Sequence, residues 1–405
     1  MAVNFPVPRG CPFAPPPEYE RLREEAALVR AELPRGWAWL VTRHAEAQQV
    51  LGDPRISTDP VTPGHPMAAM TAEAPSEEEQ RIRARFQAGQ FIDMDPPRHG
   101  VYRRMLIPEF SVRRVREMRP GIQEVTDRLV DGMLKQGSSA DLVEAFGMAL
   151  PSMVTCRLLG IPDADRDFFQ SRTREMIDAG VGSSRDGITA AVEVWNYLDD
   201  LIAKAGRRPG DDLVGRLVTA RRETGELSHD EMVGMTFLLL VAGHETTANM
   251  IPLGVLTLLR DPGQLAGLRA DPAGWPSAVE ELLRYHSIVD WVGFDRVATE
   301  DMEIGGQVVR AGEGIFVLGA SANRDPRVFE RPDELDVRRG ARNHVAFGYG
   351  VHQCLGQNLA RAELEIAYRT LFERIPGLRV VGDDDELPFK YDRVVFGMGS
   401  LPVAW

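Results

Sequence analysis

Cysteine is scarce in this chain of 405 residues, which contains only Cys11, Cys156 and Cys354. Three cysteines do not make a disulfide framework, and no Cys-x-x-Cys pair is present to suggest a redox or paired metal-binding motif. This scarcity excludes a small scaffold held together by disulfides and predicts a reducing compartment, the cytoplasm.

Positive charge and long apolar runs are also in short supply. Lysine and arginine number 47 against 60 aspartates and glutamates, a net charge of −13, which argues against a nucleic-acid partner because a phosphate-binding face must be positive. The longest apolar run, 235–243, falls well short of the roughly 20 residues that span a bilayer. The amino terminus has no basic stretch followed by an apolar one. We therefore expect no nucleic-acid partner, no membrane anchor and no signal peptide.

The chain does have an ordinary globular composition, 43% hydrophobic and 26% charged, which is enough for a large core. No Gly/Ser linker or block of charge offers a place to divide it. We therefore expect one domain over residues 1–405, and a monomer.

Hydrophobic spacing predicts a mainly α protein with a smaller β region, an α+β fold. Helix signals dominate from residue 97 to about 261, and the longest helix should cover about 228–260, where Ser228 and Glu231 form a capping box. At 1.5 Å per residue it would be a rod of roughly 45 to 50 Å that crosses the whole fold. Residues 59–95 are predicted to form a long irregular loop. Further helices are expected at 18–31, 44–52 and 355–374, and strands at 37–42, 302–304, 307–309 and 314–318.

The segment Phe347-Gly-Tyr-Gly-Val-His-Gln-Cys-Leu-Gly356 places a cysteine where a helix begins. The partial positive charge of a helix start would help to keep Cys354 as a thiolate, the form that binds iron. The glycines at 348, 350 and 356 would let the backbone approach a flat macrocycle, where a side chain would collide.

Three other interpretations of this segment compete with iron binding. A lone cysteine beside a Gly-rich turn is usually structural. A dinucleotide-binding loop would use a strand, which we expect at 343–347, but the third glycine of G-x-G-x-x-G falls on Gln353. A zinc site would use His344, His352 and Cys354, but structural zinc takes four ligands and no further Cys/His pair is nearby.

The segment closely resembles the haem-binding loop of the cytochrome P450 superfamily, F-G-x-G-x-H-x-C-x-G. The matching residues are Phe347, Gly348, Gly350, His352, Cys354 and Gly356. The resemblance runs from about residue 10 to the carboxyl terminus, and it implies a triangular helical body around haem b with the long helix at its centre. It further implies that Cys354 holds the haem iron, that O2 is the co-substrate, and that the loop residues Phe347, Gly348, His352 and Gly356 contact the cofactor.

A second match lies in the middle of the long predicted helix, at Ala242-Gly-His-Glu-Thr246. An acid and a hydroxyl among leucines need a reason, because both are costly in apolar surroundings. A helix kink with local back-bonding is the structural explanation. The segment resembles the family's oxygen-activation motif, which implies that Glu245 and Thr246 deliver protons to dioxygen. It also implies that Ala242 and Gly243 lie at the cofactor and that the helix bulges at Gly243.

The resemblance also implies a structural lock, a set of cations for the cofactor and a substrate pocket. Glu281 and Arg284 match the E-x-x-R motif, which locks the core beneath the cysteine loop, with Arg339 as the third member. A partly buried pair of haem propionates requires cationic partners. By family position these cations are His99, Arg103, Arg296 and His352. The implied substrate contacts, mostly apolar, are Phe86, Met94, Leu239, Val241, Ile288, Val292, Phe294 and Met398.

The activity that the family implies is a haem-thiolate monooxygenase, which inserts one oxygen atom of O2 into a C–H bond. Its substrate would be a bulky apolar small molecule such as a polyketide/macrolide, a steroid-like compound or a xenobiotic. The chain looks most similar to soluble actinobacterial members that hydroxylate vitamin D-like, macrolide or xenobiotic substrates. A peroxide-driven haem-thiolate enzyme and a non-enzymatic haem carrier or sensor are the alternatives.

Electrons must come from separate proteins, since nothing in the chain is left over for a flavin or iron–sulfur domain. A ferredoxin and its reductase are the expected source. A basic patch on the cysteine side could dock an acidic ferredoxin. Its members would be Arg103, Arg104, Arg113, Arg114, Arg116, Arg338 and Arg342.

Overall fold

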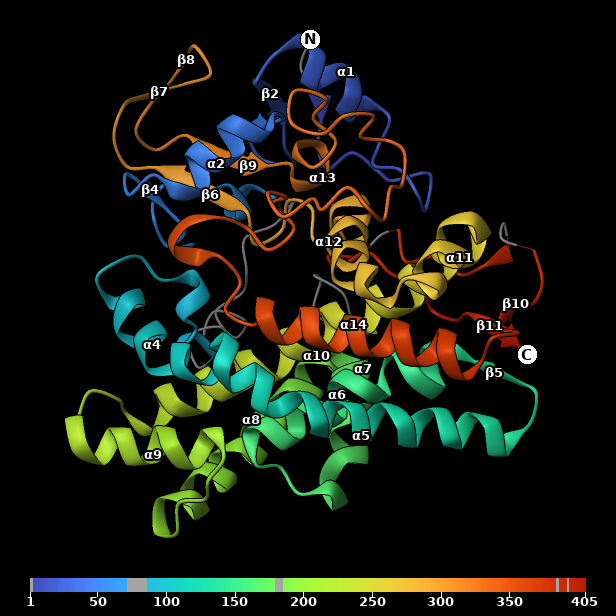
Figure 1. Cartoon of the computed structure of the whole chain (residues 1–405). Helices are drawn as coiled ribbons and strands as arrows, with labels where there is room; N and C mark the ends of the chain where they lie inside the picture. Colours follow the sequence, from blue (N-terminus) through green and yellow to red (C-terminus); the bar gives the residue numbers. More distant parts are fainter. Residues whose placement is uncertain (1–2, 71–85, 179–184, 384–385, 392) are drawn as a thin grey trace.

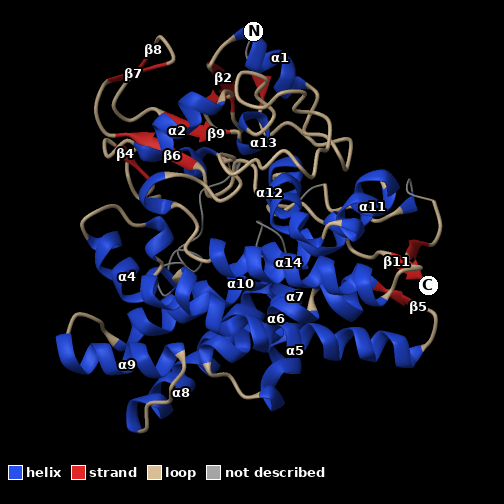
Figure 2. Ribbon diagram, viewed as in Figure 1, coloured by secondary structure: helices blue, strands red, loops and turns tan. Residues whose placement is uncertain are grey.

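The computed structural model describes residues 3–70, 86–178, 185–383, 386–391 and 393–405. Most helices gather in one large body, and most strands lie in a smaller region that also holds the amino terminus (Figure 1). Figure 2 shows this segregation of helix from strand, which agrees with the predicted α+β fold. Within the described residues, no helix is both long and apolar enough to cross a membrane.

The helical body contains elements from most of the chain. Its α-helices and those of the strand region are α1 (Glu18–Glu25), α2 (His44–Gly52), α4 (Arg98–Leu106), α5 (Val112–Gln136), α6 (Ala149–Leu159), α7 (Arg166–Asp178), α8 (Arg185–Arg207), α9 (Leu213–Thr224), α10 (His229–Arg260), α11 (Pro262–Ala270), α12 (Trp275–His286), α13 (Gly319–Ala322) and α14 (Gln357–Arg374). Short 3-10 turns are η1 (Pro66–Ala69), η2 (Phe91–Asp93), η3 (Ile107–Phe110), η5 (Asp163–Asp165), η6 (Pro272–Gly274) and η7 (Gly350–His352), and η4 (Val143–Gly147) is a π-helical turn. The predicted helix at 44–52 is confirmed.

The strands form three sheets, and the largest brings early and late parts of the chain together. They are β1 (Val3–Asn4), β2 (Leu28–Glu32), β3 (Trp37–Val41), β4 (Ile56–Ser57), β5 (Ser139–Asp141), β6 (Asp295–Ala298), β7 (Met302–Ile304), β8 (Gln307–Val309), β9 (Gly314–Val317), β10 (Arg379–Val380) and β11 (Pro402–Ala404). The six-stranded sheet has the order β1-β2-β3-β9-β6-β4. β3 runs parallel to β9, and β9 runs antiparallel to β6, which carries Arg296. The strands predicted in these regions are confirmed.

The prediction of a helix over 18–31 is wrong in its second half. α1 ends at Glu25, and β2 then pairs antiparallel with β3. Leu28 and Val29 are buried whereas Arg30 is exposed. Packing of this short apolar stretch against a distant strand therefore outweighs the local helix signal.

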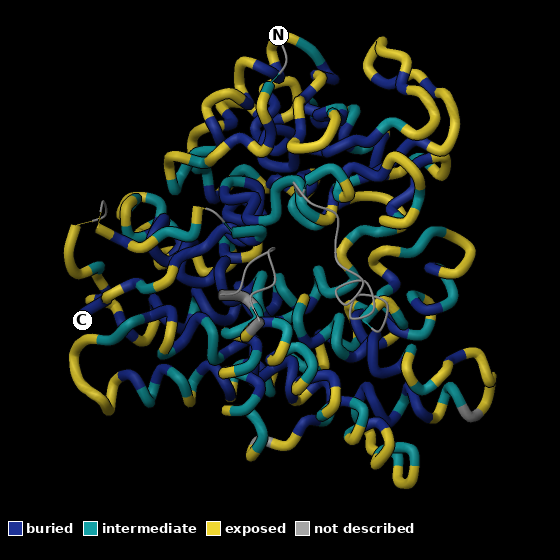
Figure 3. The backbone as a smooth tube through the Cα atoms, turned by 180° about the vertical axis from the view of Figure 1, so that it is seen from behind, coloured by how far each residue is buried: buried dark blue, intermediate teal, exposed yellow. Residues whose placement is uncertain are grey.

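The central rod is α10, which packs against α6, α8 and α14. Its predicted capping box is present, because Glu231 N donates to Ser228 Oγ at 3.1 Å and Ser228 N donates to Glu231 Oε2 at 2.7 Å. Figure 3 shows buried segments running through the helical body and the sheet region alike.

The bulge expected at Gly243 does not form, since α10 is α-helical from end to end. A Cβ atom at Gly243 would lie only 3.0 Å from Thr155 Oγ1 of α6. Glycine therefore suits the close approach of α10 to α6 at this point, and no break in α10 accompanies it.

Of two further expectations around the cysteine loop, one is confirmed and one is wrong. α14 begins at Gln357, within two residues of its predicted start. The strand expected at 343–347 is absent, and the segment forms turns instead. Val345 N donates to Asn323 Oδ1 at 2.8 Å and Ala346 N donates to His344 Nδ1 at 3.2 Å, so side chains accept from donors that a strand would have paired.

Candidate functional site

The cysteine loop is shaped by left-handed glycines and by its own backbone. Gly348 and Gly350 have φ angles of 69° and 73°, values that favour glycine. A Cβ at Gly350 would meet Leu51 O at 2.5 Å, whereas one at Gly356 would meet nothing within 4 Å. Gly350 is thus required by packing against α2, and only Gly356 leaves room for another group. Cys354 N donates to Phe347 O at 2.8 Å and closes the loop.

The Cys354 thiol lies deep among protein atoms yet keeps accessible surface, so it borders a space inside the fold. Burial raises the pKa of the thiol, while the backbone N–H groups of Gly356 and Gln357 and the cation of Arg103 oppose that rise. These donors favour the thiolate. A positive metal ion at the sulfur would complete its ionisation, so the loop fits an iron ligand.

The middle of α10 has an accessible face although the helix is central. Ala242 is exposed there, and the side chains of Leu239 and Thr246 on the same side of the helix are partly accessible. Val241 is partly accessible as well, but by helix geometry it lies on the side of Glu245. Thr246 Oγ1 donates to Ala242 O at 3.0 Å. An apolar helix face with one hydroxyl suits the wall of a small-molecule site.

Four cations predicted to bind propionates lie in one region of the fold. The rings of His99 and His352 have centroids 4.1 Å apart. Arg103 donates to Gln353 O, next to His352, and Arg296 donates to Thr58 Oγ1 at 3.2 Å and Asp295 O at 2.7 Å. None of the four makes an ion pair with a carboxylate of the described residues. We call His99, Arg103, Arg296 and His352 the cation cluster.

The pKa values of the two histidines are lowered, so both rings are neutral near pH 7 and the two arginines carry the positive charge of the cluster. Burial, followed by the charge of Arg103, lowers the pKa of His99 to about 4. Burial, followed by the charges of His99, Arg296 and Arg103, lowers that of His352 to about 3. His99 Nε2 is buried without a hydrogen-bond partner. The cation cluster therefore fits an anion, and the two propionates of haem are anions of the right kind.

The predicted lock is assembled as a closed set of contacts. Glu281 accepts from Arg284 Nε at 2.8 Å and Nη2 at 2.7 Å, and from Arg339 Nε at 3.1 Å. Arg284 Nη1 donates to Asn323 O and Pro332 O, both at 2.8 Å. Both members of the Glu281–Arg284 pair have no exposed side-chain surface.

Sequence reasoning missed Asn323, which connects this lock to the cysteine loop. Its carbonyl accepts from Arg284, its Oδ1 accepts from Val345 N, and its Nδ2 donates to Ser287 Oγ at 2.8 Å. Thr58, the partner of Arg296, was missed as well. Neither residue carries a local signal, because each acts through contacts that are distant in sequence.

The zinc alternative finds no support in the geometry. His344 Nε2 lies 3.1 Å from Glu280 Oε2, and that glutamate also accepts from Arg361 Nε at 2.6 Å. In the parts of the chain that the structure describes, no three His, Cys, Asp or Glu side chains are grouped for a metal. His344 thus serves an ion-pair network.

The predicted substrate contacts occupy two kinds of environment. Met94 and Val292 keep partial exposure, and Phe86 packs edge-on against Trp195 with ring centroids 5.0 Å apart. Ile288 and Phe294 are buried, and Met398 is fully buried in the core. The roles of all eight residues stay predictions.

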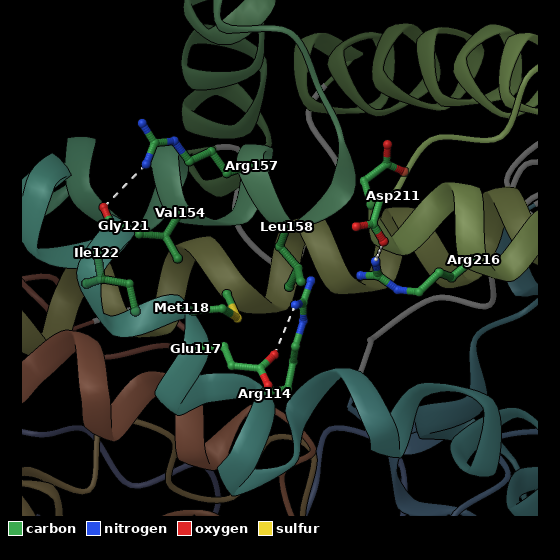
Figure 4. Close-up of a pocket in the computed structure, with 11 residues that line it drawn as sticks. Arg114, Glu117, Met118, Gly121, Ile122, Val154, Arg157, Leu158, Asp211 and Arg216 are labelled. Carbon is green, nitrogen blue, oxygen red and sulfur yellow. Dashed lines mark hydrogen bonds and ion pairs between the residues drawn. The ribbon is translucent and has the colours of Figure 1, made fainter.

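A shallow groove of about 180 Å³ lies away from these residues, between α5, α6 and the segment that enters α9. Figure 4 shows its alternating charges, with Arg114 near Glu117 and Arg216 near Asp211. Its cations are already paired, and it contains none of the predicted site residues.

Comparisons with known proteins show what the whole chain is similar to. A family model described as Cytochrome P450 matches residues 276–387. Pentalenic acid synthase of Streptomyces avermitilis is 48% identical over 100% of this chain and 97% of its own length. Vitamin D3 dihydroxylase of Streptomyces griseolus is 45% identical, again over 100% of this chain and 97% of its own. Among solved structures, cytochrome P450 MoxA from Nonomuraea recticatena has a TM-score of 0.92 at 48% identity, covering 100% of this chain and 98% of the other.

Proposed function

The chain belongs to the cytochrome P450 family, and from that premise we propose that it hydroxylates bulky apolar small molecules at a haem held by Cys354. The chain is a monooxygenase that uses haem b and O2, as its family does. The observation that carries the residue assignment is the Cys354 thiol, deep yet accessible and supplied with backbone donors.

The residues present fit the cofactor in three respects. Cys354 would hold the iron as its thiolate, the cation cluster would receive the propionates, and the accessible face of α10 around Ala242 would contact the cofactor. Bound haem supplies the activation of dioxygen and the transfer of one oxygen atom to a C–H bond.

The protein's own part in the reaction is to hold the substrate and to supply protons. Thr246 places a hydroxyl on the accessible face of α10, where it can pass a proton inward. Glu245 is the adjacent acid, and it would reload that hydroxyl from the solvent side. Apolar walls formed by side chains such as Leu239 would exclude water from the substrate.

The proposed substrate class is supported by the apolar side chains on α10 and by the names of two similar proteins. The names of two relatives state that one makes pentalenic acid and the other hydroxylates vitamin D3. An apolar face with few polar groups suits a molecule of this bulky hydrocarbon kind, whether steroid-like, polyketide/macrolide or xenobiotic. A substrate screen by the spin-state change of the haem spectrum would identify it.

Electrons would come from a ferredoxin and its reductase. The expected basic patch is smaller than seven arginines, because Arg113 and Arg114 pair with Glu117 at 3.2 and 3.3 Å. The patch members without a carboxylate partner among the described residues are Arg103, which belongs to the cation cluster, and Arg104, Arg116, Arg338 and Arg342. Arg116 and Arg342 line one cleft of about 240 Å³ together with Asn358 of α14, the helix that follows Cys354. An acidic ferredoxin docked on this cleft would approach the proximal side of the cysteine loop.

The reducing compartment predicted from cysteine usage is part of this proposal. Cys11, Cys156 and Cys354 form no disulfide bond with one another. A thiolate ligand and a reducing electron-transfer chain are both compatible with the cytoplasm.

The proton role is tested by Thr246→Ala, with Thr247→Ala as the neighbouring control. The Thr246 variant should consume reductant and dioxygen but release hydrogen peroxide in place of product, because the inward hydroxyl is lost. The control should stay coupled, since Thr247 is buried away from the accessible face. Unchanged product per reductant in Thr246→Ala would contradict the assignment.

A further inference from the structure

Residues 287–294, which we call the wall segment, connect α12 to β6, and three of them are predicted substrate contacts, Ile288, Val292 and Phe294. The wall segment has little regular pairing. Val289 forms an isolated antiparallel bridge with Val395, and Phe396 N donates to Ile288 O at 2.8 Å. A short stretch with few ladder hydrogen bonds needs other contacts to hold its position.

The amino-terminal part of the chain supplies such contacts through Asp290. The hydroxyl of Tyr19 in α1 donates to Asp290 Oδ2 at 2.7 Å, and Ala320 N in α13 donates to Asp290 Oδ1 at 2.9 Å. Gly319 N donates to the main-chain carbonyl of Asp290 at 3.1 Å. α1 and α13 contact each other in the region of the amino terminus (Figure 1). Asp290 therefore ties the wall segment to two helices that lie outside it.

The donor in the hydrogen bond between Tyr19 and Asp290 is the tyrosine. Tyr19 has no exposed surface, and burial followed by the charge of Asp290 raises the pKa of its hydroxyl well above the ordinary value. Burial raises the pKa of Asp290 as well, whereas the hydrogen bonds from Ala320 and Tyr19 and the charge of Arg9 oppose that rise. Removing the hydroxyl would leave one carboxyl oxygen of Asp290 without its donor, which is costly inside a protein. The hydrogen bond therefore resists displacement of Asp290.

Other amino-terminal residues contact the wall segment and its neighbours on either side of Asp290. Arg9 Nη2 donates to His286 O at 3.1 Å, at the end of α12. The same guanidinium lies 4.1 Å from the centroid of the Phe396 ring. The rings of Phe5 and Trp291 meet edge-on with centroids 5.2 Å apart. These amino-terminal residues thus support the wall segment, and Tyr19 is the one that donates a hydrogen bond to its middle.

We propose that Tyr19 and Asp290 are positioning residues that determine which bulky substrates the enzyme accepts. Their hydrogen bond fixes the wall segment, and the wall segment in turn places Ile288 and Val292 against the substrate. Tyr19 and Asp290 act through this segment and do not touch the substrate. A large, rigid, apolar molecule fills the site up to the wall, so its binding depends on a wall that is already in place, whereas a small ligand needs only part of the site. This inference rests on the proposed function.

The test compares Tyr19→Phe with Tyr368→Phe in the haem-loaded protein. Tyr368 is also fully buried, and its hydroxyl donates at 2.8 Å to Met250 O in α10 rather than to the wall segment. The probes are clotrimazole, an imidazole that carries three aryl rings, and imidazole alone, each titrated by the change in the haem absorption spectrum.

Tyr19→Phe should raise the dissociation constant of clotrimazole by roughly tenfold and leave that of imidazole within about twofold. Tyr368→Phe should match the wild type with both probes. A clotrimazole constant in Tyr19→Phe that stays within about twofold of the wild-type value, or falls below it, would overturn the inference.

Substitutions at Asp290 test the pairing itself. In Asp290→Asn the side-chain carbonyl can accept from Ala320 N while the amide donates to the hydroxyl oxygen of Tyr19, so clotrimazole binding should be retained. Asp290→Leu should weaken it as Tyr19→Phe does, and the two changes together should cost little more than either alone, because the residues act as a pair. Losses that add, or a loss in Asp290→Asn, would contradict the pairing. Tyr19→Phe and Asp290→Asn still decide the matter if Asp290→Leu fails to fold.

Hydrogen exchange measured by mass spectrometry gives a readout that needs neither turnover nor a probe. Tyr19→Phe should speed exchange in the peptides that contain the N–H groups of Ala320 and Phe396, which donate to the wall segment, and Tyr368→Phe should leave them unchanged. Faster exchange with unchanged clotrimazole binding would make the pair a stabilising contact only, and the inference would be wrong. If the wild type shows no spectral change with either probe, the haem site of the proposed function fails first.

Discussion

The protein buries two groups of charged side chains, and the two differ in how their charge is balanced. In the lock, Glu281 accepts from both Arg284 and Arg339, and backbone carbonyls take the remaining donors. In the cation cluster, His99, Arg103, Arg296 and His352 share a region without an ion pair to any described carboxylate. The lock is complete within the chain, whereas the cation cluster has Asp93, Asp95 and Asp295 in its neighbourhood but no ion pair with them, and so can accept a further anion.

The pairing of charges therefore distinguishes a structural element of the fold from a binding site. Buried charges are costly unless paired, so a fully paired set stabilises the fold it belongs to. An unbalanced set raises the free energy of the apoprotein and lowers that of a complex with an anion. The same cations that depress the pKa of His99 and His352 are the partners that two propionates would receive.

Breaking the lock should have the largest effect. Arg284→Met leaves buried Glu281 with Arg339 as its remaining cationic partner and leaves the carbonyls of Asn323 and Pro332 without their donor, which should lower the free energy of unfolding by about 3 kcal/mol. Arg331→Met removes the exposed pair with Glu334 at 2.7 Å and should cost under about 1 kcal/mol. Urea denaturation of both variants measures the contrast, and equal losses would show that the lock is not a special element.

Weakening the cation cluster should lower the affinity for haem while leaving the apoprotein stable, which is the opposite of the effect on the lock. Arg296→Met removes a buried cation, so the apoprotein should keep its stability or gain some. The haem should then dissociate more readily, with a dissociation constant raised by roughly tenfold through the loss of one charge-assisted contact. Transfer of haem to a competing acceptor protein measures this change. An apoprotein destabilised as strongly as Arg284→Met would make Arg296 a structural residue.

Lowering the pH should have the smallest effect on the free energy of unfolding. It should act differently on the apoprotein and on the haem-loaded protein. The pKa of His99 is about 4 in the folded chain against an ordinary value of 6.5, so between those values the unfolded chain binds more protons. The stability that the folded protein gains by keeping His99 neutral is therefore fully present above about pH 6.5, and it is lost as the pH falls toward 4.

Bound haem should reduce this loss of stability at low pH, because its propionates would raise the pKa of His99. Buried His244, whose pKa is also lowered to about 4, lies outside the cation cluster and should contribute the same loss in both forms. Unfolding midpoints measured from pH 7 to pH 4 test the contrast, and His99→Phe should reduce the difference between the apoprotein and the haem-loaded protein, leaving the contribution of His352. An identical acid response of apoprotein and haem-loaded protein would count against the anion site.

Features that depend on local spacing could be predicted from the sequence. The capping box at Ser228 set the start of α10, and alternation and turn glycines set β7 to β9. The E-x-x-R pair could be placed because residues three apart share a helix face.

Features that depend on distant contacts could not be predicted in this way. The helix expected at 18–31 gives way to β2 because β3 lies beside it. The bulge expected at Gly243 is absent, and this glycine instead lies close to Thr155 of α6. A polar cavity beside Glu245 joins residues between 141 and 399, and no local pattern reveals that they meet.

The central claim is that Cys354 holds the haem as its thiolate. The most direct measurement is the absorption spectrum of the reduced, carbon-monoxide-bound protein, with Cys354→Ser beside Cys156→Ser as a control for loss of a buried cysteine. The account predicts the red-shifted thiolate band in the wild type and in Cys156→Ser, and its loss in Cys354→Ser. Survival of the band in Cys354→Ser, or its absence from the wild type, would contradict the account.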